Sequence, residues 1–142
     1  MQPKRTNIMQ IEKIYDLSFD VAQVYRAWVA NATVIPPATT MDINPVVGGH
    51  YRLIMETSDF SGRNEGVFSL VEPGVRLCYS WEWNNDGERT EIDVRFSATS
   101  TGCRVTLLHA GFASLDSAQR DDSRWDSYIE GFTAHLEANQ SA

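Results

Sequence analysis

The sequence predicts a single α+β domain in which an antiparallel sheet is covered by a long carboxyl-terminal helix. Short runs with alternating apolar residues, divided by turn residues, occupy the chain from about residue 38 to 112. One run with helical spacing follows an early strand, and a second ends the chain. With 142 residues the chain has the length of one ordinary domain, so we expect residues 1–142 to share one core.

The amino-terminal part predicts a strand followed by a helix. Residues 8–17 alternate, with one side formed by Met9, Ile11, Tyr15 and Leu17. Residues 18–32 change to helical spacing, and Asp20 is the expected N-cap. The apolar stripe of this helix comprises Val21, Val24, Tyr25, Trp28 and Ala32. Pro36 and Pro37 cannot continue the helix, because proline lacks a backbone N–H.

Six further strands are expected, at residues 39–46, 49–56, 65–72, 76–83, 89–97 and 103–112. Residues 58–64 are rich in Ser, Gly and Asn, which is typical of a turn. Because short turns join consecutive strands, we expect an antiparallel meander. The strand at 89–97 has the clearest alternation. Its apolar face consists of Ile92, Val94 and Phe96, and its solvent-facing side of Glu91, Asp93 and Arg95.

Two adjacent glycines, Gly48 and Gly49, precede the strand at 49–56. A glycine loop that binds phosphate opens a helix, whereas the residues after Gly49 are strand-like. We therefore expect a tight corner, where positive φ or close backbone packing excludes a side chain.

The carboxyl end predicts the helix that covers the sheet. Its apolar stripe comprises Trp125, Ile129, Phe132 and Leu136, with Tyr128 on the flank. Residues 114–124 either form a lead-in turn or extend this helix backwards. A sheet with one apolar face needs a cover, and this helix carries the largest apolar stripe of the chain.

Composition and charge exclude several classes of protein. Hydrophobic residues make up 42% of the chain and charged residues 22%, which argues against disorder, fibrous repeats and membrane spans. The formal net charge of −7 repels nucleic acid and anionic lipid surfaces, and no basic patch overrides it. The amino terminus has no apolar stretch long enough for a signal peptide core, so we expect a cytoplasmic protein that does not insert into membranes.

The two cysteines, Cys78 and Cys103, are expected to be reduced thiols. In the expected meander they lie on strands separated by a third, which places their backbones roughly 9–10 Å apart. A disulfide needs Cα atoms within about 7 Å. The pair should therefore stay unbridged.

The order of the elements resembles the START-like helix-grip fold of the SRPBCC superfamily. The chain is most similar to its bacterial AHSA-like family, whose members resemble the activator of heat-shock-protein ATPase. The segments that carry the resemblance are SFDVAQVYRAW, GGHYR, EGVFSLVEPGVRLCYSWEW, TGCRVTLLHAGF and RWDSYIEGFTAHLE, within about residues 8–138. The chain departs from the family pattern at Arg124, where a glycine is usual, and lacks the usual tryptophan soon after the first helix. The resemblance implies a curved sheet wrapped around the terminal helix, with a cavity between them for apolar molecules.

Aromatic residues make up 11% of the chain, and many fall on faces that should point inward. They either fill the core or line a ligand pocket, which is largely apolar with a few polar groups. The candidates for a ligand-binding role are Trp28, Tyr51, Phe68, Tyr79, Trp81, Trp83, His109, Trp125 and Phe132.

Catalytic chemistry has few candidates in this sequence. His109 shares a strand face with apolar residues, and could act as an acid or base with Tyr51 or Glu65, although a histidine on such a face is more often a hydrogen-bonded core residue. Glu65 and Glu82 lie nearest the aromatic strands, where a buried carboxyl would have a raised pKa, although a strand carboxylate is more often solvated. The scattered histidines favour no metal site, and no P-loop, dinucleotide fingerprint or nucleophile elbow is present. We expect no cofactor.

Three functions remain open. The first is binding of a small hydrophobic or amphipathic molecule under the terminal helix, by a monomer or a homodimer. The second is an enzyme of the cyclase or hydrolase type, acting on a polyketide-like substrate in the same cavity. The third is a co-chaperone that stimulates an ATPase; activators of that type carry a further amino-terminal domain beside the one that this chain resembles.

Overall fold

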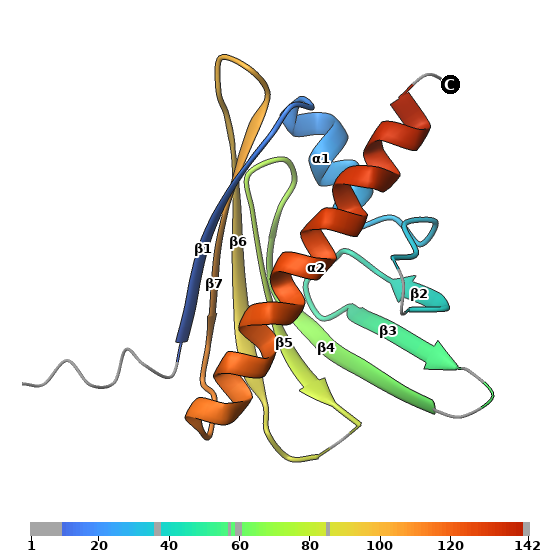
Figure 1. Ribbon diagram of the computed structural model, residues 1–142, viewed down its shortest axis with the longest axis vertical. Coiled ribbons are helices and arrows are strands. Elements are labelled where there is room, and N and C mark those ends of the chain that lie inside the picture. Colours follow the sequence, from blue (N-terminus) through green and yellow to red (C-terminus); the bar gives the residue numbers. More distant parts are fainter. Residues whose placement is uncertain (1–9, 36–37, 57, 59–60, 85, 141–142) are drawn as a thin grey trace, which may run out of the picture.

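The structure is a computed structural model that describes residues 10–35, 38–56, 58, 61–84 and 86–140. Its elements are β1 (Gln10–Leu17), α1 (Val21–Trp28), β2 (Thr40–Ile43), β3 (His50–Glu56), β4 (Ser61–Glu72), β5 (Arg76–Trp83), β6 (Thr90–Ala98), β7 (Cys103–Ala110) and α2 (Leu115–Gln140). The strands form a 7-stranded sheet in the order β1-β7-β6-β5-β4-β3-β2, and every neighbouring pair is antiparallel. Figure 1 shows the curved sheet with α2 lying diagonally across it. This is the predicted α+β helix-grip fold.

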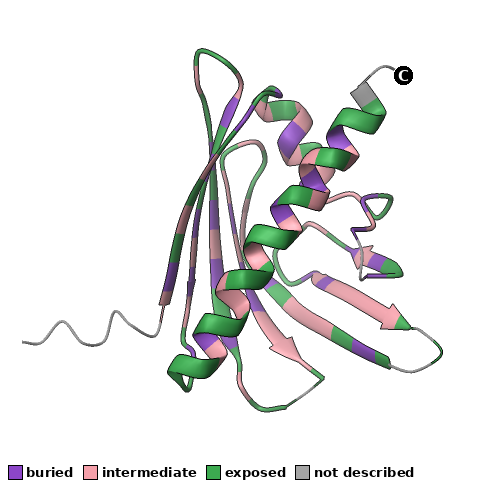
Figure 2. Ribbon diagram, in the orientation of Figure 1, coloured by how far each residue is buried: buried purple, intermediate pink, exposed green. Residues whose placement is uncertain are grey.

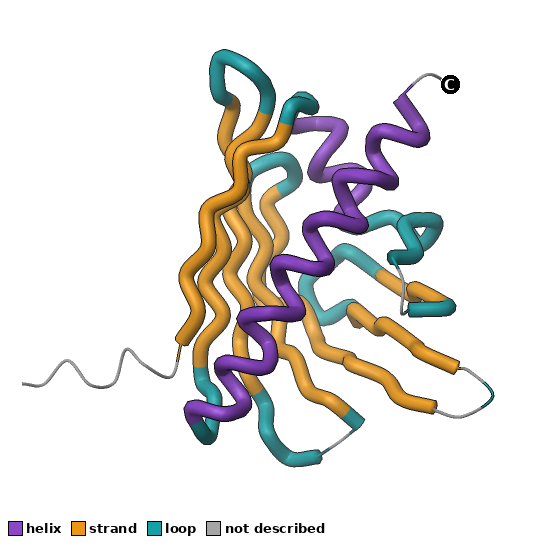
Figure 3. The backbone as a smooth tube through the Cα atoms, in the orientation of Figure 1, coloured by secondary structure: helices purple, strands orange, loops and turns teal. Residues whose placement is uncertain are grey.

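The sheet is a meander from β2 to β7 with β1 added beside β7. The pairing of β1 with β7 places Tyr15 opposite Val105 and Leu17 opposite Cys103. Both helices lie on the same side of the sheet (Figure 3), and α1 contacts β6 and β7. The predicted inner residues Ile92, Val94 and Phe96 are buried. The core therefore lies between the helices and the concave face of the sheet (Figure 2).

Helix α1 starts as predicted but ends earlier. The Asp20 carboxylate accepts a hydrogen bond from the backbone N–H of Gln23 at 2.8 Å, as an N-cap does. The helix ends at Trp28, so Ala32, which the sequence placed on its apolar stripe, lies outside the helix. The Asn31 side chain accepts a hydrogen bond from the Ile43 N–H at 2.7 Å, which ties this segment to β2 instead. The predictions for Met9, Pro36 and Pro37 fall outside the described residues.

Strand β4 is longer than the sequence predicts. It begins at Ser61, although residues 58–64 have the composition of a turn. Pairing with β3 runs from Ser61 opposite Glu56 to Val67 opposite His50. An available partner strand decides the conformation here, because strand propensity is weaker than cross-strand pairing.

Helix α2 includes the segment that the sequence left open. It begins at Leu115, and the Ser114 hydroxyl accepts a hydrogen bond from the Ser117 N–H at 3.1 Å. Its outer side is exposed, and Ile129, Phe132 and Leu136 are buried towards the sheet (Figure 2). None of the helices in the described ranges is long and apolar enough to cross a membrane.

Polar contacts hold the middle of α2 to strand β1. The Tyr15 hydroxyl donates a hydrogen bond to Asp126 at 2.9 Å. The Lys13 ammonium lies 3.0 Å from a carboxylate oxygen of Asp122 and 3.2 Å from one of Asp126. Together these contacts place α2 near the β1 edge of the sheet.

The cysteine prediction is confirmed. Cys78 on β5 and Cys103 on β7 are both free, and β6 lies between them. Cys78 lies opposite Asp93 of β6, and Cys103 opposite Ala98 of the same strand.

The corner prediction for the two glycines is also confirmed. Gly48 has a φ of +86°, and a Cβ at Gly49 would collide with the backbone oxygen of Asn44. The Gly48 N–H donates to the Phe68 carbonyl and the Phe68 N–H donates to the Gly49 carbonyl, each at 2.9 Å. The two glycines thus fit the β2–β3 connection tightly against β4.

The two glycines should differ in their tolerance of alanine. Gly48→Ala meets open space and suffers only from its positive φ, so we expect a loss of about 1–2 kcal/mol in the free energy of unfolding. Gly49→Ala forces backbone atoms apart and should cost about 3 kcal/mol. Urea denaturation of the two variants measures both losses. A larger loss for Gly48→Ala than for Gly49→Ala would contradict the corner geometry.

Candidate functional site

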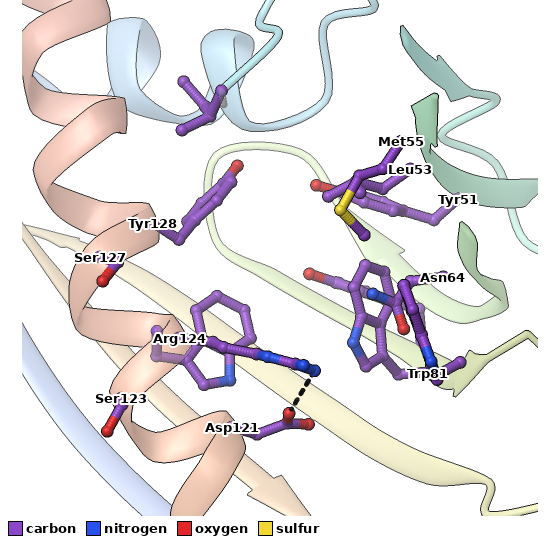
Figure 4. Close-up of a pocket in the computed structure, with 14 residues that line it drawn as sticks. Tyr51, Leu53, Met55, Asn64, Trp81, Asp121, Ser123, Arg124, Ser127 and Tyr128 are labelled. Carbon is purple, nitrogen blue, oxygen red and sulfur yellow. Dashed lines mark hydrogen bonds and ion pairs between the residues drawn. The ribbon is translucent and has the colours of Figure 1, made fainter. Parts of the chain in front are cut away.

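A cavity of about 540 Å³ lies between α2 and strands β3, β4 and β5 (Figure 4). This volume falls within the range of small-molecule sites, roughly 300–1,000 Å³. The sheet side and the loop after α1 contribute Ile35, Tyr51, Leu53, Met55, Asn64, Tyr79, Trp81 and Trp83. Helix α2 contributes Asp121, Ser123, Arg124, Trp125, Ser127 and Tyr128.

Strand alternation places the sheet residues of the wall. Successive side chains of a strand point to opposite faces, so Tyr51, Leu53 and Met55 of β3 share the cavity side. Trp81 and Trp83 of β5 do the same. Of the β3 residues only Tyr51 was among the sequence candidates. The same alternation, applied to the whole strand, would have added Leu53 and Met55.

Aromatic rings form the inner part of this wall. Tyr51 and Tyr79 stack with ring centroids 4.7 Å apart and planes 5° apart. Trp81 packs edge-on against Tyr51 at 5.5 Å. Such contacts hold large rings in defined positions, so the wall is preorganised.

An ion pair lies on the helix side of the cavity. The Arg124 guanidinium donates to the Asp121 carboxylate at 3.2 Å, and its carbon lies 5.8 Å from the centre of the Trp83 ring. Burial raises the pKa of Asp121 above its ordinary value, while Arg124 and Arg120 oppose that shift. These charged residues were missed by the sequence analysis, although Arg124 stood out as a departure from the family pattern.

A buried hydrogen-bond chain fixes Trp125 against the sheet. The Trp125 indole N–H donates to His109 Nδ1 at 3.0 Å. Because an indole nitrogen only donates, Nδ1 must be the unprotonated nitrogen and Nε2 must carry the hydrogen. Nε2 lies 2.7 Å from the Thr90 hydroxyl, which donates to the Trp81 carbonyl at 3.0 Å. The chain thus links α2 to β7, β6 and β5 in one direction.

The sequence candidates divide between the wall and the core. Five line the cavity: Tyr51, Tyr79, Trp81, Trp83 and Trp125. The other four are fully buried and are not among the lining residues: Trp28, Phe68, His109 and Phe132. Trp28 packs against Trp125 and Phe132 behind the wall. Their aromatic character predicted burial, but not which side of the wall each would occupy.

The acid–base pairs considered from the sequence are not assembled. His109 uses both ring nitrogens in the buried chain, and burial lowers its pKa to about 3. Glu65 forms ion pairs with Arg52 and Arg63, each at 3.2 Å. Neither His109 nor Glu65 lines the cavity.

Glu82, the other carboxylate considered from the sequence, is held in a turn. Glu82 accepts a hydrogen bond from the Gly87 N–H at 2.9 Å in the turn after β5. Within the described ranges, no group of three His, Cys, Asp or Glu side chains is placed to hold a metal ion.

The lowered pKa of His109 predicts acid sensitivity. In the unfolded chain His109 takes up a proton near pH 6.5, whereas in the folded protein it does so only near pH 3. The contribution of this difference to the free energy of unfolding is therefore complete above pH 6.5 and declines as the pH falls below it. The loss between pH 7 and pH 5 should be about 2 kcal/mol. His109→Gln should be less stable at pH 7 but should lose less on acidification. Urea denaturation at both pH values measures this.

His135→Gln provides the matched control, because His135 lies on α2 outside the hydrogen-bond chain of His109 and contacts Asn139 instead. It should keep the wild-type pH dependence. An unchanged pH dependence in His109→Gln would show that His109 is not the buried neutral group.

Comparisons with solved structures show the same fold. A protein from Chromobacterium violaceum superposes with a TM-score of 0.79 at 18% identity, covering 91% of this chain and 97% of that one. The AHSA1-like protein from Aeromonas hydrophila gives 0.76 at 22% identity, covering 92% and 93%. DynU16, from the dynemicin biosynthetic locus, gives 0.77 at 14% identity, covering 91% of this chain and 47% of DynU16.

A search of curated proteins found no match. The family model described as Activator of Hsp90 ATPase homolog 1-like protein matches residues 10–137. This match confirms the resemblance seen in the sequence, and the chain belongs to that family of START-like proteins.

Proposed function

We propose that this protein binds a small apolar or amphipathic molecule in the cavity between α2 and the sheet. The observation that carries the proposal is a cavity of about 540 Å³ whose wall includes Tyr51, Trp81, Trp83 and Tyr128. Sites for small molecules are mostly apolar, with a few polar groups that fix orientation. Here the Arg124–Asp121 pair and the tyrosine hydroxyls supply those polar groups.

Ligand binding is favoured over the enzymatic alternative by the position of His109. A general acid or base must come within hydrogen-bond reach of its substrate. His109 lies behind Trp125 and has both ring nitrogens engaged. The family name and the DynU16 locus describe other proteins, and the cavity of this chain is the feature that supports a ligand.

The binding proposal predicts that filling the cavity weakens binding. The uncharged fluorophore N-phenyl-1-naphthylamine is a suitable probe, because it becomes bright in an apolar site. Met55→Trp places a larger side chain into the cavity and should weaken binding about tenfold or more, which corresponds to about 1.4 kcal/mol. Fluorescence titration of wild type and variant measures the dissociation constants.

Ile54→Trp is the matched control, because Ile54 is adjacent on β3 and its side chain points to the opposite face. It should bind the probe as the wild type does. Failure of the wild-type protein to bind the probe, or equal binding by Met55→Trp, would contradict a ligand in this cavity.

A further inference from the structure

Three tyrosine side chains meet at one end of the cavity. Tyr51, Tyr79 and Tyr128, here called the tyrosine triad, all line it. In Figure 4 the hydroxyls of Tyr51 on β3 and Tyr128 on α2 point toward each other across the cavity. Tyr51 and Tyr79 are stacked side by side on the sheet. The triad thus brings hydroxyls from both walls to the same place.

One hydroxyl of the triad lacks a well-formed hydrogen bond within the described protein. The Tyr79 hydroxyl accepts a hydrogen bond from the Trp28 indole N–H at 3.3 Å. The Tyr128 hydroxyl oxygen is buried, and no described residue forms a hydrogen bond of good geometry with it. The Tyr51 hydroxyl is its nearest partner, close enough for a weak hydrogen bond that affects the pKa of both tyrosines. That bond would still leave one of their two O–H groups without an acceptor.

The triad stays uncharged at neutral pH. Burial raises the pKa of all three tyrosines, that of Tyr128 to about 12. The charged residues of the described wall are Asp121 and Arg124, which pair with each other on α2. A ligand carboxylate at the triad would be buried without a cation, which is costly.

We propose that the tyrosine triad recognises a neutral carbonyl-type oxygen at the inner end of the ligand. This inference rests on the proposed function and specifies its ligand class: an uncharged molecule with a hydrogen-bond acceptor at one end. A carbonyl oxygen has two lone pairs, so it accepts from two hydroxyls and adds no further donor. The buried Tyr128 hydroxyl, which lacks a well-placed acceptor among the described residues, gains one when the ligand binds.

Two probes of nearly the same shape test this. 2-Acetylnaphthalene carries a carbonyl where 2-isopropenylnaphthalene carries a C=CH₂ group. Each is titrated against the protein loaded with N-phenyl-1-naphthylamine, and the displacement gives its dissociation constant. The wild-type protein should prefer the ketone by about three- to tenfold, the range of one net hydrogen bond. This comparison requires no substitution.

Variants assign the preference to the triad. The double variant Tyr51→Phe with Tyr128→Phe should lose most of the ketone preference, because only the Tyr79 hydroxyl remains as a donor. Tyr25→Phe removes a half-buried hydroxyl of α1 outside the cavity wall and should keep the wild-type preference. Thermal melting shows that each variant is folded before it is titrated.

The outcomes separate the two proposals. Equal affinity of the wild-type protein for ketone and alkene overturns the triad inference but leaves the cavity as a binding site. A ketone preference of undiminished size in the double variant overturns it as well. If the wild-type protein does not bind the fluorescent reporter, the binding function fails and the triad inference fails with it.

Discussion

The width of the sheet relative to a single helix determines the rest of this structure. Seven strands spaced about 4.8 Å apart span roughly 29 Å, whereas a helix with its side chains is only about 10–12 Å wide. Helix α2 therefore cannot cover the concave face alone. Short α1 fills the space over β6 and β7 with Trp28 and Val24, but no further helix within the described residues covers β3 to β5. The cavity lies on that uncovered side.

Polar contacts decide on which side of α2 the space remains. Lys13 and Tyr15 hold the helix to β1 through Asp122 and Asp126. Trp125 is fixed to β7 through His109, whose tautomer is set by the donors and acceptors around it. These anchors all lie toward the β1 edge, so α2 does not close onto β3. The aromatic wall opposite is kept in place by ring stacking within the sheet, as between Tyr51 and Tyr79.

Local patterns predicted most of the fold and part of the site. Alternation and helical spacing identified the strands, the buried face of β6 and the stripe of α2, because these depend on neighbours within one element. The early start of β4 depends on pairing with β3, which residues 58–64 do not encode locally. The division of aromatic residues into wall and core depends on the position of α2, so Trp28 and His109 could not be separated from Trp125. Arg124 was visible as a departure, but its partner Asp121 was not.

The most direct test is a crystal structure of the ligand-free protein under xenon pressure, because xenon enters apolar cavities that side chains leave unfilled. We expect α2 to keep its contacts with β1 and β7, and xenon to occupy the space bounded by Leu53, Trp81 and Tyr128. A structure in which α2 has closed onto β3 and β4, with no xenon between them, would contradict the account.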